Sequence, residues 1–132
     1  MLALVKPEPD SQRVLRRAWL SAGRLGAELD ALYVRRPGAA LSEDEQVSLA
    51  ALRRLAIVRG AHFLEVEGDS LVDSVRSVVL ERGSTYVLVG TPDESRKREI
   101  LHGSLVSALV RSLPGVDVRV VANRADRSGA PE

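Results

Sequence analysis

The chain has 132 residues, of which 45% are hydrophobic and 28% charged, and its 19 basic and 18 acidic side chains leave a net charge of +1. This length fits one compact domain, and the near-balance of charge argues against broad nucleic-acid binding. The absence of cysteine excludes disulfides, thiolate metal sites and a cysteine nucleophile. No uncharged stretch approaches the roughly 20 residues that a membrane-spanning helix needs, so we expect a soluble cytoplasmic protein.

Strands and helices alternate from the first residues onward. Leu2–Val5 is an unbroken apolar run, typical of a strand that is covered on both faces. A helix follows, which Asp10 or Ser11 can cap, and Ser42–Glu45 forms a capping box for the next helix. The apolar stripes that predict these two helices are Val14, Leu15, Ala18, Ala22 and Leu25, and then Leu49, Leu52 and Ala56.

The second half of the chain continues the alternation. Phe63–Glu67 alternates apolar and charged residues, Ser70–Asp73 repeats the cap pattern, and Tyr86–Val89 is again unbroken. A fourth helix is expected to open at Gly103-Ser104, followed by a strand in Val116–Val121. The helical stripes here are Val75, Val78 and Val79, and then Leu105, Leu109 and Leu113.

Each predicted helix ends at a glycine that can take a left-handed conformation, and a strand follows at once. These glycines are Gly26, Gly60, Gly83 and Gly115. Five strands separated by four helices indicate an α/β fold with a parallel sheet and helices on both faces.

Strand composition predicts the order of the sheet. The unbroken first and fourth strands belong at the centre, and the alternating third and fifth strands belong near the edges, which gives the order 3-2-1-4-5. In such an open sheet a ligand binds where the winding reverses, outside the carboxyl ends of the strands. Two loops are therefore candidates for the site, Lys6–Asp10 and Gly90–Ser104.

The second loop has features of a phosphate site. A glycine at a strand end lets a ligand approach the backbone, and a Gly-Ser pair that opens a helix offers amides and a hydroxyl to an anion. The alternative is an ordinary strand exit and a serine helix cap. The candidate ligand-binding residues are Gly90, Arg96, Lys97, Arg98, Gly103 and Ser104.

The loop resembles that of the universal stress protein family, whose nucleotide-binding members carry Gly, two residues, Gly, nine residues, and then Gly-Ser or Gly-Thr. Gly90 and Gly103-Ser104 keep this spacing, while Asp93 stands at the middle glycine. The resemblance covers residues 2–122 and leaves residues 123–132 as a polar tail. It is closest to the domain of this family in Kdp potassium-uptake sensor histidine kinases, through Val14–Ala18, Gly23–Leu29, Tyr33-Val34, Pro37-Gly38, Ser95–Arg98 and Leu101–Val106.

Three departures bear on the ligand that the resemblance implies. Lys6 replaces the aspartate usual after the first strand in nucleotide-binding members, and Lys6 and Glu8 replace the Ser-x-Ser pair of Kdp-type domains. Asp93 places a carboxylate where phosphates would lie, at a cost of about 1–4 kcal/mol at surface dielectric. We therefore expect weak or absent ATP binding, and a nucleotide or cyclic-di-AMP remains a candidate ligand.

Other residues give no sign of catalysis or of a metal site. His62 is expected to be structural, and His102 could touch an anion when protonated. The two histidines lack metal-ligand spacing, and Ser104 has no evident histidine base. Trp19 lies beside the apolar stripe of the first helix and is expected to pack in the core or on its flank rather than to stack on a base.

The sequence therefore predicts a non-catalytic regulatory domain of a Kdp-type osmosensitive potassium sensor kinase, acting in signal transduction by ligand or protein contact. Its partners would be other domains of the kinase and a second copy paired through the edge strand Val116–Val121, as the resemblance implies. The alternatives are a free-standing ATP-binding stress protein and an enzyme such as a nucleotide hydrolase.

Overall fold

The computed structural model describes residues 1–90 and 97–122, with the backbone alone for residues 97–104. Within these residues five strands and four helices alternate as the sequence predicts. In chain order they are β1 (Leu2–Leu4), α1 (Asp10–Leu25), β2 (Asp30–Arg35), α2 (Glu43–Val58), β3 (His62–Glu67), α3 (Leu71–Arg82), β4 (Tyr86–Gly90), α4 (Lys97–Ser112) and β5 (Asp117–Val121).

The predicted sheet is confirmed. All described strand pairs are parallel, and the order is β3-β2-β1-β4-β5. Leu2 of β1 is in register with Asp30 of β2 on one side and with Val87 of β4 on the other. The winding therefore reverses between β1 and β4, which places a ligand-binding crevice outside the carboxyl ends of these strands.

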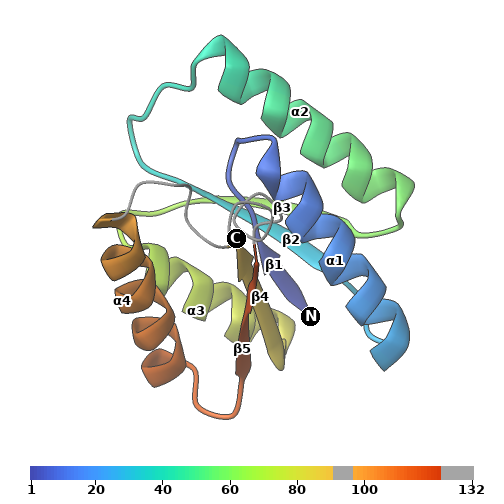
Figure 1. Ribbon diagram of the computed structural model, residues 1–132, viewed down its shortest axis with the longest axis vertical. Coiled ribbons are helices and arrows are strands. Elements are labelled where there is room, and N and C mark those ends of the chain that lie inside the picture. The colour runs from blue at the N-terminus through green and yellow to red at the C-terminus, as the bar shows by residue number, and fades with distance from the viewer. Residues whose placement is uncertain (91–96, 123–132) are drawn as a thin grey trace, which may run out of the picture.

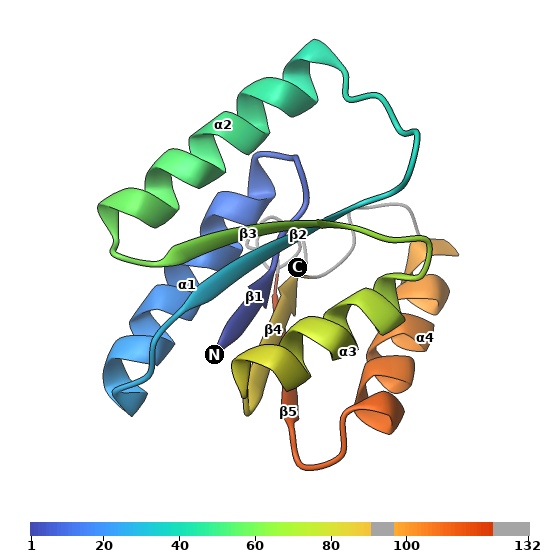
Figure 2. The same ribbon diagram turned by 180° about the vertical axis from the view of Figure 1, so that it is seen from behind.

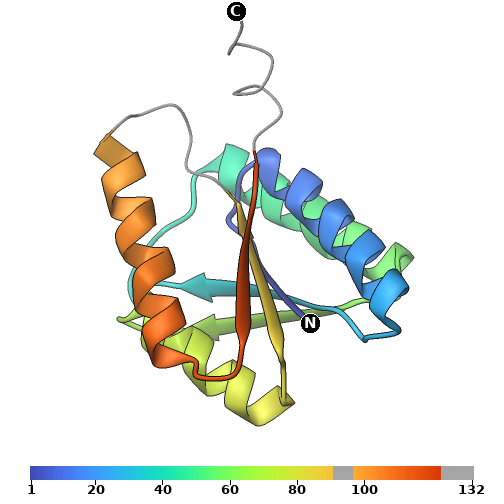
Figure 3. The same ribbon diagram turned by 60° about the horizontal axis from the view of Figure 1, so that its bottom comes forward.

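Helices cover both faces of the sheet, as Figures 1 and 3 show: α1 and α2 lie on one face, α3 and α4 on the other. Figure 2 shows the same layers from behind, with α1 and α2 toward the left of the sheet and α3 and α4 toward the right. Because β1 is covered on both sides, its residues alternate between the two cores, with Ala3 facing α1 and α2 and Leu2 facing α3 and α4. Both residues are fully buried. Among the described residues, no helix is long and apolar enough to cross a membrane.

The predicted helix ends are largely confirmed. The glycines at the four junctions have φ values of 65° (Gly26), 76° (Gly60), 70° (Gly83) and 80° (Gly115), a region that β-carbons disfavour. The hydroxyl of Ser42 accepts a hydrogen bond from the Glu45 N–H at 3.1 Å, and the Ser42 N–H donates to the Glu45 carboxylate at 2.9 Å. The capping box at the start of α2 is therefore complete. The hydroxyl of Ser70 likewise accepts from the Asp73 N–H at the start of α3.

Neither Asp10 nor Ser11 caps α1, so that prediction is wrong. The N-cap position is Pro9, at φ −60°, and it makes no side-chain cap hydrogen bond. Proline's fixed φ already suits a helix start, so the turn forms without a capping hydroxyl. The Ser11 hydroxyl instead accepts a hydrogen bond from the backbone N–H of Lys6 at 2.9 Å, which fixes the loop that leaves β1.

The expected start of the fourth helix is also wrong. Helix α4 begins at Lys97, so Gly103 and Ser104 lie inside it rather than at its N-terminus. The residues before Gly103, Lys97–Leu101, are mostly good helix formers, so the helix can begin earlier than the Gly-Ser pair. Gly103 inside the helix lowers helix stability by only about 1 kcal/mol. The stripe of α1 needs one correction as well, because Leu25, in the last turn, is 60% exposed.

Candidate ligand pocket

A cavity of about 470 Å³ lies at the carboxyl ends of β1, β2, β3 and β4, at the edge of the sheet where a ligand was expected. The described parts of the helix starts and loops that follow these strands complete its wall. Most of the lining is apolar, with a few charged groups and one tyrosine, as in pockets for small organic ligands. The lining residues are Leu4, Val5, Lys6, Pro7, Tyr33, Val34, Arg36, Ala39, Ala40, Leu41, Glu45, Gly68, Asp69, Leu71, Val89, Gly90 and Leu105.

Both loops nominated from the sequence contribute to this pocket, through Lys6 and Pro7 after β1 and Gly90 at the end of β4. Arg96 lies outside the described residues, as does Asp93. Lys97, Arg98, Gly103 and Ser104 lie on α4, within the segment whose side chains are not described. Phosphate binding by these residues therefore stays a prediction.

The pocket extends further toward β2 and β3 than the sequence suggested. Tyr33, Arg36, Glu45 and Asp69 all line it, and none was among the expected site residues. Tyr33 lies on β2, Glu45 on α2 and Asp69 between β3 and α3. Arg36 lies in the connection between β2 and α2, where its carbonyl accepts from the Ala39 N–H at 3.1 Å. The predicted strand order 3-2-1 could have indicated the part of the pocket at β2 and β3, because the carboxyl ends of neighbouring parallel strands lie on the same side of the sheet.

Tyr33 is the most buried polar side chain of the pocket, with 6% of its surface exposed. Burial raises the pKa of its hydroxyl above 10.0; the charges of Glu65 and Glu45 raise it further, while Arg35 opposes them. No hydrogen bond of the Tyr33 hydroxyl to another described residue is present. A neutral phenol in this position can donate one hydrogen bond to a ligand and accept another.

Replacing Tyr33 by phenylalanine is expected to make stability less sensitive to alkaline pH. Because the folded pKa is raised, the unfolded chain loses the tyrosine proton first, so stability is lost as pH rises from 10.0 through the folded pKa. Urea unfolding between pH 9 and 11, followed by circular dichroism, should show a shallower decline for Tyr33→Phe than for the wild type. Tyr86→Phe is the matched control, and equal declines for wild type and Tyr33→Phe would contradict this prediction.

Of the described residues that line the pocket, four are charged, and two of these are engaged within the protein. The Lys6 ammonium lies 3.6 Å from the Glu8 carboxylate, and the Glu45 carboxylate accepts from the Ser42 N–H in the capping box. By contrast, no ion pair of Arg36 or Asp69 is present among the described residues. Both of these side chains are exposed at the rim of the pocket.

Gly90 has a packing reason to be glycine. A β-carbon on it would meet Cγ2 of Val14 on α1 at 2.9 Å, closer than carbon atoms can approach without displacement. Since valine is stiff about χ1, Val14 cannot easily turn away. Close contact between β4 and α1 therefore accounts for Gly90 independently of any ligand.

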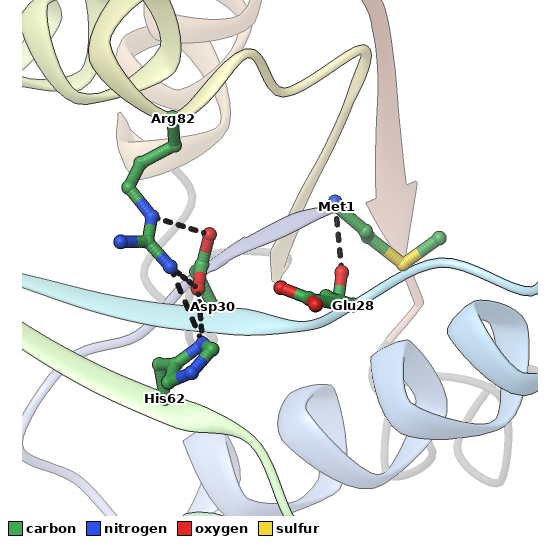
Figure 4. A network of polar contacts seen from close by, with 5 residues as sticks. All are labelled: Met1, Glu28, Asp30, His62 and Arg82. Carbon is green, nitrogen blue, oxygen red and sulfur yellow. Dashed lines mark hydrogen bonds and ion pairs between the residues drawn. The ribbon is translucent and has the colours of Figure 1, made fainter.

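A separate polar cluster joins β2, β3 and α3 at the amino ends of the two strands, away from the pocket (Figure 4). The Asp30 carboxylate is buried, and Arg82 donates two hydrogen bonds to it, at 2.8 and 3.1 Å. Nδ1 of the half-exposed His62 lies 3.0 Å from the same carboxylate. The hydrogen bond to Asp30, and then the charge of that carboxylate, raise the pKa of the Arg82 guanidinium. His62 thus makes the structural contact expected of it.

Trp19 lies on the flank of α1, as the sequence predicted, with its indole N–H donating to the Arg59 carbonyl at 3.0 Å. The Arg59 guanidinium stacks over the ring at 4.5 Å from its centroid. Trp19 therefore joins the ends of α1 and α2, away from the pocket. Among the residues whose side chains the structure describes, 1–90 and 105–122, no group of three or more His, Asp or Glu residues is placed to hold a metal ion.

Comparison with known proteins relates both the sequence and the fold to other chains, although no family model matches. The chain is 27% identical over 123 residues to a protein of Synechocystis sp. (strain ATCC 27184 / PCC 6803 / Kazusa) named as a sensor protein, KdpD. The match covers 93% of this chain but only 33% of the KdpD protein, so the chain spans about a third of that relative.

The structural neighbours are universal stress proteins. A universal stress protein in complex with cAMP superposes with a TM-score of 0.67 and 23% identity, covering 92% of this chain and 96% of the other. One from Archaeoglobus fulgidus in complex with dAMP gives a TM-score of 0.57 and 18% identity, covering 92% and 94%. The resemblance seen in the sequence is confirmed: the chain has the universal stress protein fold and is similar in sequence to a KdpD sensor protein.

Proposed function

We propose that this chain is a non-catalytic regulatory domain that binds an adenine mononucleotide in the pocket at the carboxyl edge of the sheet. The observation that carries the proposal is the pocket itself, which lies at the winding reversal of a fold whose neighbours include cAMP and dAMP complexes. The apolar walls suit a planar base, and the few polar groups at the rim suit a sugar and a phosphate.

The similarity to KdpD supports a place within a Kdp-type sensor kinase, where nucleotide occupancy would be coupled to potassium or osmotic signalling. In that setting the domain would act on the cytoplasmic side through contacts with other domains of the kinase. Strand β5 supports the homodimer expected from the sequence, because it is an edge strand and its Val120 is 39% exposed.

Isothermal titration calorimetry of the chain with AMP, cAMP, ATP and cyclic-di-AMP tests the proposal. We expect AMP or cAMP to bind more tightly than ATP, because the charge of Asp93, which follows β4 in the sequence, is expected to oppose a triphosphate. If cyclic-di-AMP bound while AMP and cAMP did not, the regulatory role would stand but the proposed ligand would be wrong. Binding of none of the four would contradict the proposal.

The second candidate is a free-standing ATP-binding stress protein. It is favoured by the neighbour in complex with cAMP, of which the chain covers 96%. ATP binding tighter than about 100 µM, which corresponds to about −5.5 kcal/mol, would favour this candidate over the first.

A further inference from the structure

We propose that the outward side of α1 and α2 docks on a membrane surface that carries anionic lipids. The side chains that define this outer face are Arg16, Leu20, Arg24, Arg54, Ile57 and Val58. None of them lines the pocket at the carboxyl edge of the sheet, and the proposal does not depend on nucleotide binding.

Positive charge is concentrated in the carboxyl halves of α1 and α2. Residues 16–25 and 53–59 contain six of the 19 basic residues of the chain and none of its 18 acidic residues. The rest of the chain is negatively charged overall, because it holds 13 basic and 18 acidic residues. The acidic residues of α2 lie in its first turn, at the other end of the helix, where they offset the helix dipole. A net charge of only +1 therefore conceals one strongly basic region.

Helical spacing places the residues of the outer face on the outward side of each helix. Arg16, Leu20 and Arg24 follow one another at intervals of four residues on α1. Arg54 and Val58 have the same spacing on α2. Residues four apart lie on one side of a helix, and the buried residues of both helices lie on the opposite side, against the sheet.

The outward sides of the two helices belong to one surface. Helices α1 and α2 lie next to each other in one layer and contact each other (Figure 1). Their carboxyl halves are joined by Trp19, whose indole N–H donates to the Arg59 carbonyl at 3.0 Å. The Arg59 guanidinium also lies over the Trp19 ring. A flat partner can therefore touch both helices at once.

The arginines of the outer face are available to an external anion. Arg16, Arg24 and Arg54 are exposed, and none of them makes an ion pair within the described part of the chain. Arg53, by contrast, is paired with Glu65 at 2.7 Å and does not belong to the outer face. An anionic partner can thus bind these three guanidinium groups without breaking an ion pair.

Aliphatic side chains on the same face favour a lipid surface as the partner. Leu20 is 49% exposed, Ile57 72% and Val58 74%. At a membrane interface such side chains enter the boundary of the acyl chains, while guanidinium groups stay at the level of the lipid phosphates. An acidic protein would pair with the arginines equally well, but it would need apolar hollows to receive three aliphatic side chains.

Co-sedimentation of the chain with lipid vesicles tests the proposal. We expect binding to vesicles of equal parts phosphatidylcholine and phosphatidylglycerol, and none to phosphatidylcholine alone. Arg24→Gln/Arg54→Gln should weaken this binding roughly 25-fold, because each arginine near an anionic membrane strengthens binding about fivefold. Arg76→Gln/Arg111→Gln is the matched control, which removes the same charge from exposed positions on α3 and α4 and should bind nearly as the wild type does.

Leu20→Gln/Val58→Gln tests the aliphatic side chains at unchanged charge. This variant should bind the acidic vesicles roughly tenfold more weakly than the wild type. Equal binding by the two chains would overturn the proposal, because charge alone would then explain the interaction. The proposal would also be overturned if the wild type did not bind acidic vesicles, or if the two arginine variants lost affinity equally.

Poly-glutamate serves as a second probe, which separates a membrane from an acidic protein partner. Binding to poly-glutamate without binding to acidic vesicles would assign the outer face to an acidic protein and overturn the proposal. All substituted residues are exposed, so the variants should fold, and thermal melts check this. The vesicle assay contains no nucleotide, so its failure would leave the proposed nucleotide function standing, and failure of that function would leave the docking result standing.

Discussion

Replacing Arg82 by methionine is expected to give one of the largest losses of stability of any single substitution at the surface of this protein. Among the described residues, the substitution leaves the Asp30 carboxylate, which is 5% exposed, with His62 as its one side-chain partner. A buried carboxylate deprived of its cation destabilises a fold, although solvent screens part of this interaction because the Arg82 side chain is 34% exposed. We expect a fall of about 5 °C in Tm, measured by circular dichroism.

Two further variants show whether the unpaired charge of Asp30 causes the loss of stability. Arg76→Met, also on α3 and exposed, should change Tm little, because Arg76 has no ion pair among the described residues. Adding Asp30→Asn to Arg82→Met should restore part of the lost stability, since the amide removes the unpaired charge. If the double variant were as unstable as the sum of the single variants, Arg82 would act through packing instead.

The second large effect is expected for Gly90→Ala, which should destabilise the fold by about 1–3 kcal/mol because the new methyl group overpacks against Val14. Combining it with Val14→Ala should give a chain more stable than the two single effects predict, by at least about 0.5 kcal/mol. Urea unfolding of the four chains measures this coupling. Additive losses would mean that Val14 is not the residue that excludes a side chain at position 90.

Gly68→Ala is the matched control, because Gly68 also lines the pocket at a strand end. There the new β-carbon would meet the Ser74 hydroxyl at 2.1 Å, but that oxygen can rotate away, so the loss should be small. The folded Gly90→Ala/Val14→Ala chain also distinguishes two roles for Gly90. Unchanged AMP binding would mean that position 90 requires glycine because of packing against Val14. Weaker AMP binding would support the prediction that the ligand lies close to the Gly90 backbone.

The pocket was only partly predictable from the sequence. The winding reversal indicated Lys6 and Gly90, because strand composition fixes which strands are central. Tyr33, Arg36 and Asp69 were missed, because single-residue patterns do not show how far a pocket extends along an edge. The Gly103-Ser104 pair predicts a helix start, but the helix-forming residues before it extend α4 back to Lys97.

The sequence by itself determined the alternation of elements, the strand order, the glycine-terminated helices and the serine caps of α2 and α3, since each depends on local propensity or on the periodic burial of apolar side chains. Only the tertiary structure decided that Arg82 pairs with Asp30 across 52 residues, that Val14 excludes a side chain at Gly90, and that Arg36 and Asp69 lie at one rim. These features depend on distances between elements far apart in the chain, which no local pattern encodes.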